Sequence, residues 1–265
     1  AYAGTLILES SSVSVDINGT EDLYIGSYLK NLGTIKIINS GNIDMAKDVV
    51  QNSRMGIFAY YDGTTVKDFV TDDSVLDYNN LVFETGTITG STGSILAKNI
   101  TIKENVILNL QNSIYPMVSW TGDVSGGGTP GIVNNYAVDF SNATGNENGI
   151  ITINGATSFY DLKATGLGGK TLSFGEACNI TVTNEMTLSG TDVENPLTVK
   201  GTKGGTINVA QNNIGNYLTL ESENLPTITN AGSEKLFEIC LYSSSDSNEA
   251  AKVKNWLVFA GEMIF

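Results

Sequence analysis

The sequence contains no histidine and a single arginine, Arg54, among its 265 residues. Without histidine the chain cannot build a Ser-His-Asp or Cys-His catalytic centre, a zincin helix or most zinc sites. Its 14 Lys and Arg residues face 28 Asp and Glu residues, which gives a formal net charge of −14 at pH 7. Such acidity predicts no nucleic-acid partner and no attraction to an anionic membrane, and it is typical of an exposed, secreted surface.

Cysteine and long apolar runs are also scarce. Cys178 and Cys240 lie far apart and in no metal-type spacing, so we interpret them as two buried thiols, with a disulfide as the alternative. No apolar run approaches the roughly 20 residues that cross a bilayer, which predicts no membrane insertion of this segment. The glycines Gly126–Gly128 lack the Lys-Ser/Thr of a phosphate-binding loop. No cofactor is therefore predicted.

What the sequence does contain is repetition. Ala97–Leu108 is closely similar to Ala177–Leu188, and Pro116 and Pro196 follow at the same offset of eighty positions. A chain built from one recurring unit usually stacks its units in a line. The repeat-like segments are about 5–60, 78–140 and 159–225, with 226–265 as a terminal coil or module junction.

Apolar and polar residues alternate in short runs such as Thr171–Phe174 and Leu197–Val199, which predicts strands with one buried and one wet face. The best helix candidate, residues 247–254, is barely two turns long. Three strands of roughly nine residues per coil would place about three coils in eighty residues, which a sandwich does not explain. The predicted fold class is therefore all-β: one elongated, right-handed parallel β-helix (β-solenoid) over residues 1–265, with little or no helix.

The last eleven residues, Asn255–Phe265, are apolar and lack a polar finish. Terminal coils of repeat proteins normally need capping. We therefore expect that this chain is cut from a longer array, or that its ends meet a partner, end-to-end self-association included.

Several segments together resemble the β-strand repeats of large bacterial surface proteins, broadly the filamentous-haemagglutinin-like adhesins and autotransporter passengers. The segments that carry the resemblance are Phe159–Leu162, Gly168–Phe174, Asn179–Val182, Met186–Gly190 and Leu197–Val199, with Asn255–Phe259 resembling the end of a module. The resemblance covers about residues 78–259. It implies a secreted or cell-surface protein that functions in attachment, and it carries no catalytic motif.

The rival reading is a β-helix polysaccharide hydrolase or lyase, which needs paired carboxylates. The available clusters are Asp72–Asp73 and Asp16 with Glu21–Asp22, and we interpret Asp72–Asp73 as turn residues. Asp62–Gly63 and the acids of Asp44–Asp48 are also interpreted as turn residues, so no metal site is predicted.

Aromatic side chains are the remaining candidates for ligand contact, because they stack on sugars and on receptor side chains. We expect a ligand-contact loop at Trp120, Tyr115 and Tyr136, with Trp120 beside the glycine loop Gly126–Gly131. The predicted function is a structural and adhesive solenoid segment that performs no catalysis and displays loops to a host or surface glycan or protein. A polysaccharide-active enzyme and a self-assembling fibre subunit are the alternatives.

Overall fold

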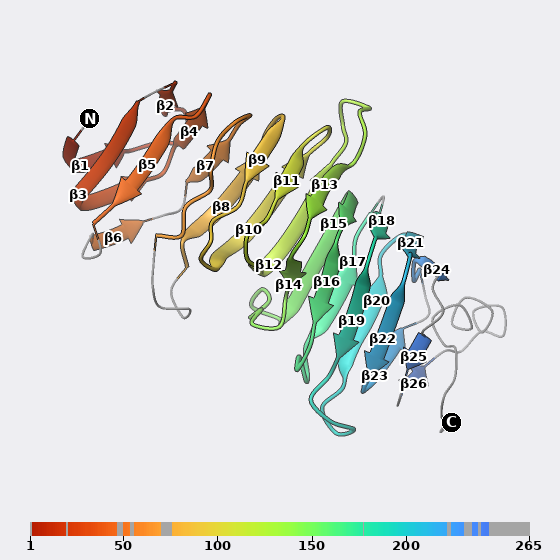
Figure 1. The fold of residues 1–265 in the computed structure, drawn as a ribbon. Coiled ribbons are helices and arrows are strands. Elements are labelled where there is room, and N and C mark those ends of the chain that lie inside the picture. The colour runs from red at the N-terminus through yellow and green to blue at the C-terminus, as the bar shows by residue number, and fades with distance from the viewer. Residues whose placement is uncertain are drawn as a thin grey trace. The chain divides into compact units, whose positions relative to one another are not determined.

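The computed structural model describes residues 2–19, 21–46, 50–53, 56–69, 76–176, 178–221, 224–230, 235–237 and 240–243. These residues form strands, turns and loops, and no helix occurs among them (Figure 1). The predicted helix at 247–254 and the chain end Asn255–Phe265 lie outside the described residues. The strands are β1 (Tyr2–Leu8), β2 (Ser14–Asn18), β3 (Asp22–Asn31), β4 (Thr34–Ile38), β5 (Asn42–Met45), β6 (Val50–Ser53), β7 (Ile57–Tyr60), β8 (Tyr78–Phe83), β9 (Thr87–Thr89), β10 (Ile95–Lys103), β11 (Ile107–Asn109), β12 (Ile114–Asp123), β13 (Gly131–Asn134), β14 (Ala137–Asp139), β15 (Ile150–Phe159), β16 (Asp161–Ala164), β17 (Thr171–Phe174), β18 (Cys178–Val182), β19 (Glu185–Ser189), β20 (Leu197–Gly201), β21 (Gly205–Val209), β22 (Asn212–Asn216), β23 (Leu218–Glu221), β24 (Thr227–Asn230), β25 (Lys235–Phe237) and β26 (Cys240–Ser243).

The chain divides into two compact units. Unit 1 comprises Ala1–Ile114 and Asp123–Tyr136, and unit 2 comprises Tyr115–Gly122 and Ala137–Phe265. Each unit is built from short parallel strands that pair with the strands of the next coil.

Unit 2 has three strands per coil. Strands β17, β18 and β19 form one coil, and β20, β21 and β22 form the next. The register joins Thr171 to Thr198 and Cys178 to Gly205, so that one coil here is 27 residues long. β15 bends and supplies two sides of its coil, since its first half pairs with β17 and its second half with β18. Figure 1 shows these strands side by side.

Unit 1 is wound in the same way. β2, β4, β7, β8 and β10 pair in sequence along one side, and β9, β11 and β13 pair along another. The third ladder joins β3 to β1, β5 and β6. Its shortest coil runs from Tyr78 to its partner Ala97.

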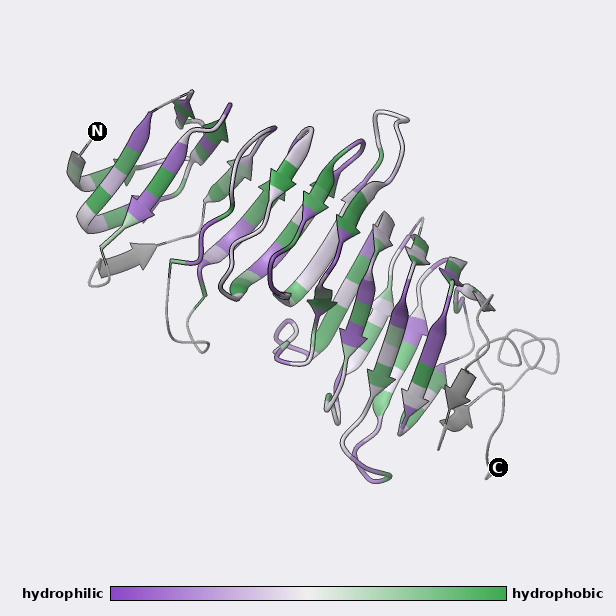
Figure 2. Ribbon diagram, viewed as in Figure 1, coloured by the Kyte–Doolittle hydropathy of each residue, from purple (hydrophilic) through white to green (hydrophobic). Residues whose placement is uncertain are grey.

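The cores of both units are columns of stacked apolar side chains. In unit 1, Ile35, Phe58, Leu81 and Ile100 are register partners on successive coils and are at most 1% exposed. In unit 2, the equivalent column is Ile151, Leu172, Val199 and Leu220, all fully buried. Figure 2 shows hydrophobic and hydrophilic residues alternating along many of the strands, as the period of two in a strand requires. Burying each such side chain contributes about 1.5–3 kcal/mol.

A polar pair interrupts the apolar core of unit 1. The Tyr60 and Tyr78 hydroxyl oxygens lie 2.7 Å apart, and the Tyr78 hydroxyl donates to the Lys67 carbonyl oxygen at 2.6 Å. Burial raises the pKa of the Tyr60 phenol well above its ordinary value of 10. The buried Asp77 carboxylate accepts hydrogen bonds from the backbone amides of Phe69 and Leu96. These contacts fasten the irregular segment before β8 to the core.

The fold class predicted from the sequence is confirmed: the chain is an all-β parallel β-solenoid of about nine turns. The predicted three strands per coil hold in unit 2. The eighty-residue similarity relates larger pieces of chain, because Ile100 pairs with Leu81 and Ile180 pairs with Ile207, the strand partners one coil away. In both copies the similar segment folds as a strand, a turn and a second strand.

Candidate functional site

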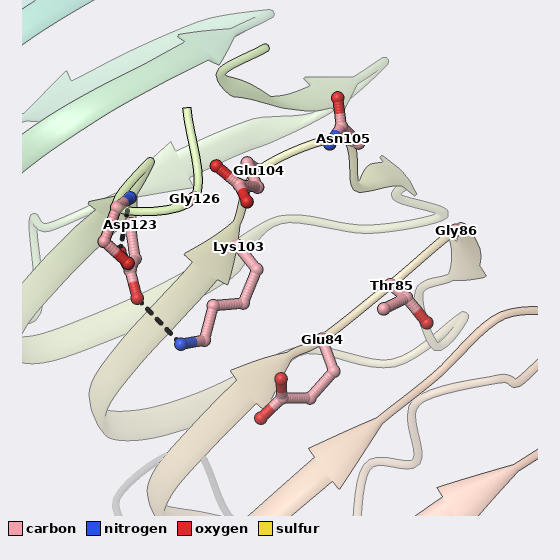
Figure 3. A pocket seen from close by; sticks show the side chains of 9 residues that line it. Glu84, Thr85, Gly86, Lys103, Glu104, Asn105, Asp123 and Gly126 are labelled. Carbon is pink, nitrogen blue, oxygen red and sulfur yellow. Dashed lines mark hydrogen bonds and ion pairs between the residues drawn. The ribbon is translucent and has the colours of Figure 1, made fainter. Parts of the chain in front are cut away.

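Three neighbouring turns of unit 1 create a pocket. β8 ends at Phe83, β10 at Lys103 and β12 at Asp123, and the turns that follow lie beside one another (Figure 3). The pocket has a volume of about 380 Å³. We call it the corner pocket, and its lining residues are Glu84, Thr85, Gly86, Lys103, Glu104, Asn105, Asp123, Ser125 and Gly126.

An ion pair crosses the corner pocket between successive coils. Lys103 Nζ lies 2.7 Å from Asp123 Oδ2, and both side chains are part-exposed, at 36% and 26%. The hydrogen bond from Lys103, reinforced by hydrogen bonds from Ser125, lowers the pKa of Asp123 to about 2. The same bond raises the pKa of Lys103, and the charges of Glu84 and Glu104 act in the same direction. Both partners are therefore charged at neutral pH, and Asp123 serves as a hydrogen-bond acceptor.

Glu104 and Asn105 hold the glycine loop against the preceding coil. Glu104 Oε2 accepts a hydrogen bond from the Gly128 amide at 2.8 Å, and Asn105 Oδ1 accepts one from the Thr129 amide at 3.1 Å. A Cβ atom added to Gly126 would meet Glu104 Oε1 at 1.8 Å, so only glycine fits there without displacing the carboxylate. The start of the glycine loop, at Gly126, is part of the pocket wall.

Glu84 differs from the other two carboxylates of the pocket. Phe83 is the register partner of Ile102, so Glu84 follows directly beside Lys103 on the neighbouring coil. Within the part of the chain that the structure describes, its carboxylate makes no hydrogen bond or ion pair, and no dashed line reaches it in Figure 3. Tyr61 is next to Glu84 on the other side, one residue past the paired Tyr60 and Phe83. Burial, then the charge of Glu84, raises the pKa of Tyr61.

The predicted ligand-contact residues lie elsewhere. Trp120 in β12 is fully buried, packs against the Phe159 ring at a centroid distance of 5.3 Å and donates from Nε1 to Thr157 Oγ1 at 3.0 Å. This corrects the expectation of a ligand contact, because an inward strand position removes the indole from the surface. Tyr115 is half-buried in the same strand, and Tyr136, in unit 1, is 46% exposed. The ligand contact expected at Tyr115 and Tyr136 stays a prediction.

The acidic residues singled out in the sequence have different surroundings in the structure. Asp16 forms an ion pair with Lys36 at 3.5 Å, and Glu21 accepts a hydrogen bond from the Asn18 amide. Asp62 accepts a hydrogen bond from the Thr87 amide at 2.6 Å, which agrees with its interpretation as a turn residue. Asp72–Asp73 lie outside the described residues.

Cys178 matches its interpretation as a buried thiol. It is free and 1% exposed, and burial raises the pKa of its thiol to about 12. No group of three or more His, Cys, Asp or Glu side chains that could hold a metal ion occurs among the described residues.

Sequence reasoning missed Glu84, Lys103 and Asp123 as members of one site. The signal was present, since Glu84 directly follows one alternating strand, Lys103 and Asp123 end the next two, and the three positions are spaced by one coil. The three residues align only at the local coil length of about twenty residues, and the eighty-residue repeat does not bring them into register.

Comparison with known proteins gave no match to a family model, a curated protein or a solved structure. In the described ranges there is no helix with the length and apolar character needed to span a membrane.

Proposed function

We propose that this chain is a structural segment of a larger secreted or cell-surface bacterial protein, which displays loops for attachment to a glycan or protein and performs no catalysis. The single observation that supports it best is the use of polar side chains between coils. Asn99 Nδ2 donates to Asn80 Oδ1 and Asn134 Nδ2 donates to Asn109 Oδ1, each at 3.0 Å.

Unit 2 repeats the pattern with other residues. Asn184 Nδ2 donates to Asp161 Oδ1 at 2.7 Å, and the Thr206 hydroxyl donates to Asn179 Oδ1 at 2.8 Å. Side chains that satisfy the next coil reinforce the backbone ladders and leave the connecting loops as the places where sequence can vary. Strands that are fixed to one another and loops that can vary together make a rigid support that carries loops.

The loops have the character that display requires. The segment between β19 and β20 is closed by Asp192, whose Oδ1 accepts hydrogen bonds from the amides of Glu194 and Asn195. Its tip presents Val193 at 53% exposure, the highest among the large exposed hydrophobic side chains of the described residues. An ordered loop with an apolar tip loses little conformational entropy when it contacts a partner.

The proposal is tested by incubating the chain with a panel of plant, bacterial and animal polysaccharides. Reducing ends and unsaturated products are then measured, and binding to the same polysaccharides and to cell-surface proteins is recorded in parallel. We expect binding without turnover. Product that accumulates in proportion to the chain concentration would replace the structural role with a polysaccharide-active enzyme.

A further inference from the structure

The sequence contains a modification motif that the proposed structural role does not use. Asn-x-Ser/Thr, with any residue except proline in the middle, occurs at Asn18, Asn99, Asn142 and Asn179. In this motif the carboxamide nitrogen of the asparagine accepts a sugar, and the hydroxyl two residues later is part of the recognition. Asn, Ser and Thr are abundant in this chain, so the surroundings of each asparagine have to decide. Thr20 lies outside the described residues, and the structure therefore distinguishes among Asn99, Asn142 and Asn179.

The motifs at Asn99 and Asn179 lie inside paired strands. Asn99 belongs to β10, which pairs with β8, and Asn179 belongs to β18, which pairs with β15 and β21. Asn99 Nδ2, the atom that would carry the sugar, donates to Asn80 Oδ1 at 3.0 Å. Asn179 Oδ1 accepts a hydrogen bond from the Thr206 hydroxyl at 2.8 Å. A transferase reaches these motifs only after ladder hydrogen bonds open, because the strand backbone is engaged with its neighbours.

Asn142 lies in an exposed turn between β14 and β15. The turn is closed by the Ala143 amide, which donates to the Phe140 carbonyl oxygen at 2.8 Å. Asn142 and Thr144 are exposed, whereas Ala143 between them is buried, so the carboxamide and the hydroxyl of the motif both face outward. Within the described part of the chain, the Asn142 carboxamide makes no hydrogen bond. Its nitrogen can therefore react without displacing another group.

The turn is fastened to the solenoid on both sides of the motif. The Ser141 amide donates to Asp139 Oδ1 at 2.8 Å, and the Gly145 amide donates to the Met117 carbonyl oxygen at 2.9 Å. The Thr144 hydroxyl has only a long contact of 3.3 Å with the Gly145 carbonyl oxygen, so it can turn toward an enzyme at little cost. The structure thus presents a complete motif on a fixed turn, with both of its reactive groups accessible.

We propose that Asn142 is the acceptor of an N-linked sugar. The donor is a sugar whose anomeric carbon bears a pyrophosphate leaving group, attached either to a nucleotide or to a lipid. Asn142 Nδ2 forms a bond to the anomeric carbon while the bond from that carbon to the pyrophosphate oxygen breaks. The pyrophosphate leaves with the bonding electron pair, and the amide nitrogen loses one proton to a base of the transferase. The product carries a bulky, hydrophilic group on the surface of unit 2 and leaves its strand ladders uncovered.

The test treats the whole folded chain with a soluble asparagine N-glucosyltransferase and UDP-glucose, and peptide mass spectrometry measures the rate at each asparagine. Short synthetic peptides centred on each motif give the rates without structure. After division by the peptide rates, we expect Asn142 to react at least about tenfold faster than Asn99 or Asn179, because those two react only after local opening. Equal or faster reaction at Asn99 or Asn179 would refute the assignment.

Two variants at Thr144 separate recognition of the motif from folding. Thr144→Ser keeps the hydroxyl, and we expect sugar addition to Asn142 at nearly the parent rate. Thr144→Ala removes the hydroxyl and should abolish sugar addition, while the denaturant midpoint stays unchanged because the side chain is exposed. Sugar addition to Thr144→Ala at the parent rate would show that the motif is not what the transferase reads.

Mass spectrometry of the chain isolated from the cells that produce it shows whether the site is used. A single sugar on Asn142 indicates the nucleotide-linked donor and an oligosaccharide indicates the lipid-linked donor, and either result supports the proposal. Unmodified Asn142 in that material would overturn it. Such a failure leaves the structural role untouched, because the turnover and binding assays judge that role without reference to sugar addition.

Discussion

The described residues of unit 1 join their coils with more ion pairs than those of unit 2. In unit 1, three lysines form ion pairs with a neighbouring coil: Lys30 with Glu9 at 3.6 Å, Lys36 with Asp16 at 3.5 Å and Lys103 with Asp123 at 2.7 Å. In unit 2, the described side-chain links are mostly between hydroxyl and amide groups, such as the Ser141 and Thr165 hydroxyls at 2.8 Å. Its one described ion pair, Lys203 with Glu176, is well exposed on both sides.

The difference shows how one fold provides two kinds of surface. Neutral groups one coil apart hydrogen-bond to each other directly, as the Ser141 and Thr165 hydroxyls do. Charged side chains are longer, are satisfied only in part, and leave room between turns, as Glu84 does beside Lys103. The apolar columns are equally buried in both units. The units should therefore respond alike to damage in the core and differently to changes of charge, salt and pH.

The largest effect should come from a charge in the core column, where the units are expected to be alike. Ile180→Asp places a carboxylate at a fully buried position between Thr157 and Ile207, at a cost of several kcal/mol. Denaturant unfolding followed by circular dichroism should show loss of the transition of unit 2. Asn179→Asp adds the same charge one residue away on the exposed face and should unfold almost as the parent does. An Ile180→Asp chain that melts as cooperatively as the parent would contradict the strand assignment.

A smaller effect is expected for Trp120→Phe in unit 2. The change removes the Nε1 hydrogen bond to Thr157 and leaves a small cavity next to Phe159, which together lower the free energy of unfolding by about 1–3 kcal/mol. Tyr160→Phe, at a 38% exposed position, is the matched control and should be near neutral. Unchanged stability in Trp120→Phe would mean that the indole is not packed as described.

The smallest effect concerns the ion pair of the corner pocket. Asp123 has a pKa of about 2 in the folded state, below the unfolded value of about 3.9, so its contribution is complete above pH 4 and is lost as pH falls toward 2. Because the pair is part-exposed, Asp123→Asn should lower stability by less than about 1 kcal/mol at pH 7 in low salt.

This loss should disappear near pH 2, and also in 1 M salt, where screening weakens the pair in the parent chain. Urea unfolding at both pH values measures it. If the difference in the free energy of unfolding between the parent and Asp123→Asn grew on acidification, the ion pair would not be the cause of the stabilisation.

The sequence predicted the fold well because the fold depends on local patterns. Alternation in runs such as Thr171–Phe174, punctuated by Gly and Asn, identifies strands and excludes helices, and stacking follows from repetition. Inward positions were predictable from the same alternation, and both Ile100 and Ile180 are buried core residues.

The candidate site was not predictable in the same way, because a pocket depends on which turns become neighbours. Trp120 lies near the glycine loop in sequence, and strand alternation alone decides that its side chain points inward. Glu84 and Asp123 are separated by almost two coils and meet across Lys103 only when the coil lengths are known. The spacing between register partners varies from that of Tyr78 and Ala97 to the longer one of Ser119 and Thr152, so no single period aligns the residues.

The contrast between charged and neutral coil junctions is tested most directly by hydrogen exchange of the whole chain at 50 mM and 1 M NaCl. We predict faster exchange in high salt at the Gly128 amide, which donates to the Glu104 carboxylate, and no change at the Thr165 amide, which donates to the Ser141 hydroxyl in unit 2. Equal acceleration at both places, or none at the glycine loop, would contradict it.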